Sequence, residues 1–96
     1  MLTKESILKL GIECDESKAR GGIDSSYLEQ HDCFIIELTD ENTNDRLQFD
    51  KTFAYLMLGE NGEIDIEIDE TLVVNEILLK DEVELKYLLY LCGINV

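Results

Sequence analysis

The chain has 96 residues, enough for one small domain with a single hydrophobic core but not for two. Twenty-two acidic residues against eight basic ones give it a formal net charge of −14 at pH 7. Because such a charge repels nucleic acid and anionic membranes, it excludes both as direct partners, and it attracts basic protein surfaces in a salt-dependent way.

The remaining composition indicates a folded cytoplasmic domain spanning residues 1–96. Hydrophobic residues make up 45% of the chain, more than is usual in disordered proteins. No apolar run reaches the roughly 18 residues that a membrane span needs, and no apolar segment near the N-terminus would direct secretion. The cysteines Cys14, Cys33 and Cys92 form no C-x-x-C pair, which favours a reducing compartment over a disulfide framework or a zinc site.

The first predicted element is a short helix that begins after Thr3. Thr3 is a good N-cap, Leu2 before it can pack on Ile7, and Gly11 stands where helices commonly end. Residues 13–31 follow as a long loop with at most one turn of helix, because two consecutive glycines interrupt it.

Two strands joined by a polar turn are expected next. Residues 33–38 are rich in β-branched and aromatic side chains, and residues 46–50 alternate, with Leu47 and Phe49 facing inward. Residues 39–45 between them have turn chemistry throughout, so the two strands are predicted to form a hairpin. A third strand is predicted at residues 53–58, which are apolar on both faces.

The pattern in residues 60–70 is the most distinctive of the sequence. From Glu63 to Asp69, carboxylates alternate with isoleucines, which is the period of a β-strand. Ile64, Ile66 and Ile68 are expected to line the core, while the acids form a ladder on the other face at a spacing of about 6.6–6.8 Å. Like charges at that spacing repel one another, so the ladder costs stability unless something offsets the repulsion.

The turn before the ladder contains Asn61 and Gly62, the strongest short hairpin signal. A two-residue turn there would fix the register of the flanking strands. Met57 would then lie opposite Ile66 and Tyr55 opposite Ile68 on the core side. On the acidic side, Leu58 would lie opposite Asp65 and Leu56 opposite Glu67. The result would be an apolar strip beside the carboxylates, to be covered by another part of the chain or by a partner; its residues are Ala54, Leu56 and Leu58.

The C-terminal part adds a strand and a helix. Residues 71–79 are strand-like but irregular near Asn75 and Glu76. The helix begins at Asp81, with Glu84 as capping-box partner, and ends at Gly93. Its apolar stripe consists of Leu85, Leu88, Leu89 and Cys92. The predicted fold class is α+β: an antiparallel sheet of four to five strands with short N-terminal and C-terminal helices packed on one face.

No catalytic or metal-binding constellation is evident. His31 is the only histidine, and a nucleophilic pair with Cys33 would require the strand to run through residue 31. Residues 40–44 begin like a calcium loop, but the match fails at Asp45 and Lys51, where the loop needs glycine and glutamate. We therefore expect neither an enzyme nor a bound metal or cofactor.

The acids of residues 60–70 form the candidate surface for a basic protein partner. Their spacing is of the order of the roughly 3.4 Å between charges along a nucleic-acid strand. In size, charge, acidic face and lack of catalytic residues, the chain resembles small acidic phage-encoded inhibitors that mimic nucleic acid, of anti-CRISPR and anti-restriction type. The resemblance implies a stoichiometric inhibitor of a nuclease or another nucleic-acid-binding enzyme. The candidate partner-binding residues are Glu60, Glu63, Asp65, Glu67, Asp69 and Glu70, with Leu56 and Leu58.

Two other functions fit the same sequence. An immunity or antitoxin-type protein would neutralise a basic toxin through the same acids. A self-assembling module would form a homodimer through Ala54, Leu56 and Leu58, and its acids would be a solvated face only. Charge-led binding weakens with salt, whereas an apolar interface does not. In either inhibitor, Asp65→Lys with Glu67→Lys is expected to abolish inhibition and leave the fold intact.

Overall fold

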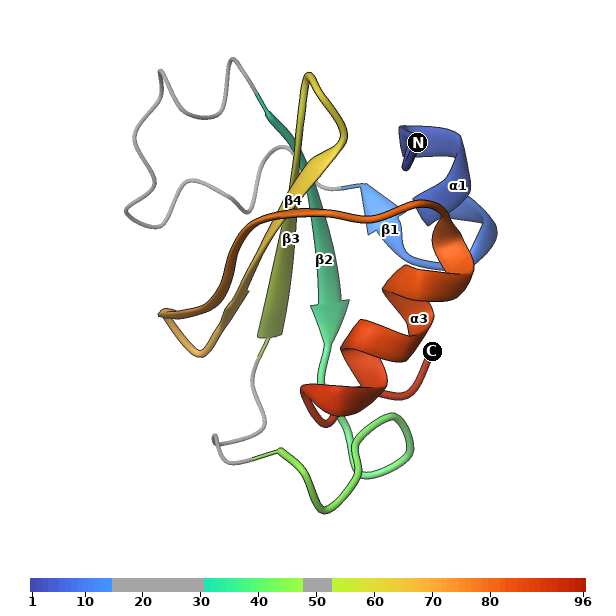
Figure 1. Cartoon of the computed structure of the whole chain (residues 1–96). Coiled ribbons are helices and arrows are strands. Elements are labelled where there is room, and N and C mark those ends of the chain that lie inside the picture. The colour runs from blue at the N-terminus through green and yellow to red at the C-terminus, as the bar shows by residue number, and fades with distance from the viewer. Residues whose placement is uncertain (15–30, 48–52) are drawn as a thin grey trace.

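The computed structural model describes residues 1–14, 31–47 and 53–96. In these residues, two helices cover one face of a five-stranded antiparallel sheet of order β1-β2-β3-β4-β5 (Figure 1). The predicted α+β class is therefore confirmed. The elements are α1 (Lys4–Lys9), β1 (Glu13–Cys14), β2 (His31–Glu37), β3 (Phe53–Gly59), β4 (Glu63–Ile68), β5 (Thr71–Leu78) and α3 (Glu82–Leu91).

Both helices begin at the predicted N-caps. Thr3 Oγ1 accepts a hydrogen bond from the backbone N–H of Ser6, and the Asp81 carboxylate accepts from two N–H groups in the first turn of α3. These side chains satisfy donors that have no partner inside the helix. Gly11 and Gly93 follow the two C-caps with φ of 81° and 97°, the left-handed conformation expected at that position.

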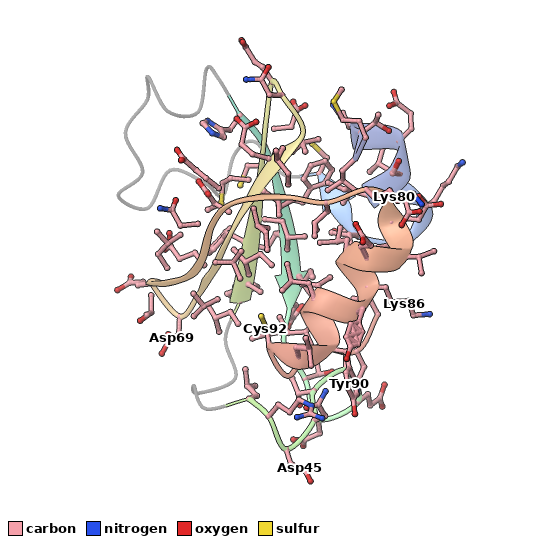
Figure 2. The ribbon with its side chains drawn as sticks, in the orientation of Figure 1. Asp45, Asp69, Lys80, Lys86, Tyr90 and Cys92 are labelled. Carbon is pink, nitrogen blue, oxygen red and sulfur yellow. The ribbon has the colours of Figure 1, made fainter. Side chains whose placement is uncertain are left out.

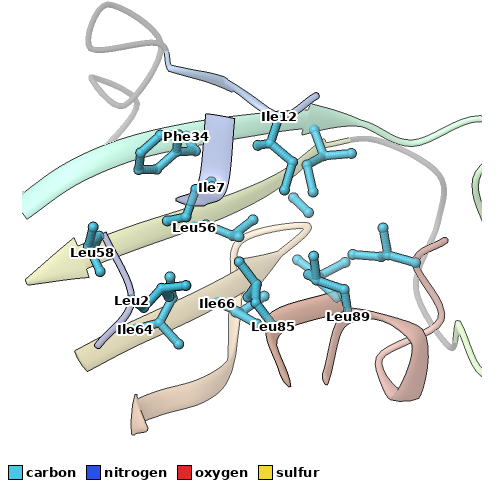
Figure 3. Packing of buried hydrophobic residues seen from close by; sticks show 14 of the residues in the cluster. Leu2, Ile7, Ile12, Phe34, Leu56, Leu58, Ile64, Ile66, Leu85 and Leu89 are labelled. Carbon is cyan, nitrogen blue, oxygen red and sulfur yellow. The ribbon is translucent and has the colours of Figure 1, made fainter. Parts of the chain in front are cut away.

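The core lies between the helices and the sheet, and Figure 3 shows its packing. The isoleucines of β4 are all buried there, as their alternation predicted. Each such side chain contributes about 1.5–3 kcal/mol through removal of apolar surface from water. The cluster combines both helices with three central strands, and includes Leu2, Ile7, Phe34, Leu56, Leu58, Ile64, Ile66, Ile68, Leu85 and Leu89.

The register of the β3–β4 hairpin differs from the prediction by one residue. Leu56 pairs with Ile66 and Leu58 with Ile64, not with Glu67 and Asp65. The cause is a connection of three residues rather than two, in which the N–H of Gly62 donates to the carbonyl of Gly59 at 3.1 Å. With φ of 82° at Gly62, this is a type I turn followed by a bulge.

One additional loop residue reverses which face of β3 meets the core, because side chains alternate along a strand. The predicted strip of Ala54, Leu56 and Leu58 is therefore in the core, with 0%, 0% and 6% of each residue exposed. The prediction that Leu56 and Leu58 lie beside the carboxylates is wrong. A homodimer through this strip is wrong for the same reason, since the strip is already covered by the helices.

Asp69 was predicted as the last member of the acid ladder, but it lies in the turn after β4. Ile68 pairs with Thr71, so Asp69 and Glu70 form a two-residue turn, with φ of 49° and 66°. Positive φ at both positions is the geometry of a two-residue hairpin turn, which was predicted at Asn61 and Gly62 instead. The ladder in β4 consequently has three members.

The hairpin predicted for residues 33–50 is not the one formed. Arg46 lies in a turn and Leu47 outside any strand, while residues 48–50 lie outside the described residues. The described part of the connection is instead held against the end of α3, where Asn44 Nδ2 donates to the carbonyl of Tyr90 at 3.3 Å and to Asn95 Oδ1 at 2.9 Å.

The strand β2 finds its partners elsewhere in the chain. It pairs with β3 over seven residues and, on its other side, with the two-residue strand β1. The strand β1 occupies the start of the predicted loop 13–31, and residues 15–30 of that loop lie outside the described residues.

The two glycines that end the helices provide a matched test of packing at the end of α3. A Cβ on Gly93 would overlap the backbone of Leu47, whereas a Cβ on Gly11 would have no atom within 4 Å. We expect Gly11→Ala to lower the free energy of unfolding by about 1 kcal/mol, through backbone strain alone. We expect Gly93→Ala to lower it by about 2 kcal/mol, because the clash adds to the strain. Urea unfolding followed by circular dichroism measures both, and equal losses would contradict the close contact at Gly93.

Candidate partner-binding face

The sheet has a second face, turned away from the helices, and the acids of β4 lie on it. Across this face Asp65 pairs with Met57, and Glu67 pairs with Tyr55. We call the surface formed by the acids of β4 and of the turns at its two ends the acidic face. Its residues are Glu60, Glu63, Asp65, Glu67, Asp69 and Glu70.

The acids of this face differ in their exposure, which separates their roles. Glu63 and Glu67 are half-buried on a regular strand, and the turn residues Glu60, Asp69 and Glu70 are exposed. A partner can reach these five carboxylates directly. Asp65, the remaining member of the acidic face, is only 6% exposed.

Asp65 has a structural role, which is to stabilise the pairing of β4 with β5. Its carboxylate accepts a hydrogen bond of 2.5 Å from the backbone N–H of Glu76, which has φ of 51°. The pairing of β4 with β5 shifts register beside Ile66, so the irregularity predicted near Asn75 and Glu76 is confirmed. A bulge leaves backbone groups without partners in the neighbouring strand, and Asp65 satisfies one of them. We therefore expect Asp65→Lys to destabilise the fold, contrary to the expectation from the sequence.

Glu63 packs over Gly59 of the neighbouring strand β3, which has no side chain in the way. Its carboxylate lies over Gly59, in the space that a Cβ at that position would fill. His31 pairs with Gly59 and therefore lies on the same face of the sheet. The carboxylate of Glu63 is thus held against the sheet, at the end of the acidic face nearest the β3–β4 turn.

Charge is divided unequally between the two layers. The five strands contain seven acids and no lysine or arginine, whereas α1 and α3 contain three acids and three bases. In Figure 2, Lys80 and Lys86 lie on the α3 side of the molecule, and Asp69 lies on the opposite side. This division orients the negative field of the molecule, so a basic surface is attracted toward the sheet rather than toward the helices.

The residues considered for catalysis do not assemble a reactive site. The strand β2 does run through His31, so His31 and Cys33 share a face. Cys33, however, is 2% exposed, and its thiol is directed at the carbonyl of Phe34. None of the three cysteines is in a disulfide, and burial raises the pKa of the Cys92 thiol, which disfavours the reactive thiolate.

The segment that resembles a calcium loop has its amides committed to the fold. Asn42 Oδ1 accepts from the N–H of Thr39 and Asn42 Nδ2 donates to the carbonyl of Glu37, both at 2.8 Å. Asn44 Oδ1 accepts from the N–H of Arg46 at 2.9 Å. Among the described residues, no group of three or more His, Cys, Asp or Glu side chains is placed to hold a metal ion.

Comparison of the chain with protein families, with curated proteins and with solved structures gives no match. Within the described ranges, no helix has the length and apolar character that crossing a membrane requires.

Proposed function

We propose that the chain is a non-enzymatic acidic inhibitor that binds a basic nucleic-acid-binding protein and excludes nucleic acid from it. Binding occurs through the acidic face. The observation that carries the proposal is the division of charge: seven acids and no lysine or arginine on the strands, against a balanced pair of helices. Acids that served solubility alone would have no reason to be concentrated on one layer.

The acidic face is also fixed in shape before a partner arrives. Glu63 and Glu67 project from a strand paired on both sides, and Asp69 and Glu70 are held in a tight turn. Fixed groups lose little conformational freedom on binding, which favours affinity. In the free protein these carboxylates repel one another. Cationic side chains of the partner placed between them relieve this repulsion, which makes the free energy of binding more favourable.

The same face suits an immunity-type protein that neutralises a basic toxin, and the identity of the partner separates the two functions. In both, a cationic nucleic-acid site of the partner is covered by carboxylates held at a spacing similar to that of phosphates. Self-assembly through Ala54, Leu56 and Leu58 is no longer an alternative, because these residues are in the core.

The proposal is tested by capture from bacterial lysate on the tagged chain at about 50 mM and about 500 mM salt, read by mass spectrometry. We expect a basic nucleic-acid-binding protein to be retained at the lower salt and lost at the higher. The purified chain should then block binding of labelled duplex DNA by that protein. A captured protein that binds DNA equally well in the presence of the chain would contradict the proposal.

A further inference from the structure

The outer side of α3 carries a second apolar stripe, separate from the side that faces the core. It consists of Val83, Tyr87, Tyr90 and Leu91, which are between 45% and 70% exposed. Their spacing of four, three and one residues places them along one face of the helix. We call these four residues the outer stripe. An exposed apolar stripe of this length on a highly charged chain marks an interaction surface.

The outer stripe belongs to the helix layer, in which acids and bases balance, and not to the acidic sheet. The guanidinium carbon of Arg46 is 5.0 Å from the centroid of the Tyr90 ring, and the Tyr87 and Tyr90 rings are 6.4 Å apart. All the bases within residues 1–14, 31–47 and 53–96 belong to α1, to α3 or to segments beside α3; they are Lys4, Lys9, Arg46, Lys80 and Lys86. A second copy of this acidic chain therefore meets less repulsion at the helices than at the sheet.

We propose that the outer stripe is a two-fold dimer interface, in which α3 packs antiparallel against α3 of a second copy. A two-fold axis at Tyr87 places position 83 opposite position 91 and position 84 opposite position 90. Val83 then meets Leu91 of the second copy, and the two Tyr87 rings meet each other. Such an interface is isologous, because the same patch is used on both copies.

Charge complementarity follows from the same axis. Glu84, an exposed acid, is brought to position 90 of the second copy, where Arg46 covers Tyr90. An open hollow beside this pair is lined by Asp45, Arg46, Tyr90 and Leu91, and it gives the incoming side chain room. The two-fold axis makes each such contact twice, so acid meets base at both ends of the interface.

The open edge of the sheet fits a second copy less well. The edge strand β5 exposes Leu72 and Leu78, but its pairing is interrupted by register shifts and by Glu76 in a left-handed conformation. Bulges of this kind oppose edge-to-edge association. Pairing there would also bring the acidic faces of two copies together. The dimer through α3 instead leaves both acidic faces directed outward, so each dimer has two faces for partners.

The full chain is tested by sedimentation equilibrium over a range of concentrations. We expect a monomer–dimer equilibrium, and Tyr87→Lys should weaken it by at least about tenfold, because it places two ammonium groups at the axis. Leu72→Lys is the matched control, since Leu72 is 52% exposed on β5, where it pairs with Glu67 of the acidic face; it should leave dimerisation unchanged. A chain that stays monomeric at every concentration would overturn the proposal, even if its outer stripe were found to bind another protein.

A charge exchange tests the antiparallel arrangement itself. Glu84→Arg and Arg46→Glu should each weaken the dimer, and the double variant should recover most of the loss. Glu84 also accepts a hydrogen bond from the N–H of Lys80, so Glu84→Arg carries a folding cost that the exchange does not repair. Recovery therefore reports the contact between copies, and a double variant as weak as the singles would overturn the arrangement. Salt screens the repulsion between two copies that each carry a net charge of −14, so dimerisation should strengthen as salt rises. This is the opposite of partner binding, so the two proposals fail separately.

Discussion

The variant Glu63→Lys with Glu67→Lys is expected to weaken binding of the basic partner by about 100-fold or more. Both side chains belong to the part of the acidic face that lies on β4, and both are half-buried. Each substitution replaces an attraction to the partner with a repulsion. The fold should be retained, because neither carboxylate lies in the core cluster. Titration calorimetry with the captured protein measures the change, and circular dichroism checks the fold.

The matched control is Glu5→Lys with Glu41→Lys. Each Glu→Lys change adds two charges, so either pair of substitutions moves the net charge from −14 to −10. Glu5 and Glu41 are exposed on α1 and on the segment after β2, away from the acidic face. We expect only a few-fold loss of affinity from this pair, through the long-range field. Equal losses from both pairs would mean that binding follows net charge, and the acidic face would not be a distinct site.

The variant Asp65→Leu is expected to lower the free energy of unfolding by about 3 kcal/mol. The substitution removes the charged acceptor from the N–H of Glu76 and leaves that donor unpaired at the bulge. Asp65→Asn keeps an acceptor oxygen and should lose about 1 kcal/mol. Urea unfolding at neutral pH measures both values.

Glu67→Leu is the control for Asp65→Leu, because it removes a carboxylate from the same strand and face. Glu67 pairs with Tyr55 and Leu72, outside the segment that Asp65 supports. Its loss should change stability by less than about 1 kcal/mol, since removal of one like charge also relieves repulsion. If Asp65→Leu were no more destabilising than Glu67→Leu, the structural role of Asp65 would be wrong.

The elements that the sequence specifies locally were predicted correctly. Thr3 and Asp81 begin helices because their side chains accept from the first turn, which depends only on neighbouring residues. The alternation of Ile64, Ile66 and Ile68 identified the buried side of β4, because a strand with a single apolar face directs that face toward the core.

Properties that depend on the count of residues in a turn were not predicted. Asn61 and Gly62 are compatible with loops of two or three residues. The loop length decides which side chains of β3 face the core and which face away from it. The two-residue turn formed instead at Asp69 and Glu70. Neither residue is the asparagine or glycine typical of such a turn, and only the positive φ of both in the structure identifies it. The pairing of β2 with β1 and β3 joins residues distant in the chain, which a local pattern cannot specify.

The negative charge of the candidate site was predicted, but the sequence did not show which of its acids are accessible to a partner and which stabilise the fold. The alternating pattern makes all the acids of residues 63–69 equivalent. Asp65 differs from Glu67 only because a bulge in β5 lies beside it, and that bulge arises from a different strand. The outer stripe was missed although its signal is in the sequence. Residues 82–91 contain two sets of apolar residues at helical spacing, and a helix that buries one set still exposes the other.

The central claim is that the acidic face binds a basic surface by charge, and the salt dependence of the dissociation constant tests it most directly. The captured protein is titrated with the chain between about 50 mM and about 500 mM salt, for the wild type and for Glu63→Lys with Glu67→Lys. We predict a steep loss of wild-type affinity as salt rises and a markedly shallower dependence for the variant. An affinity that does not change with salt, or equal slopes for the two proteins, would contradict the account.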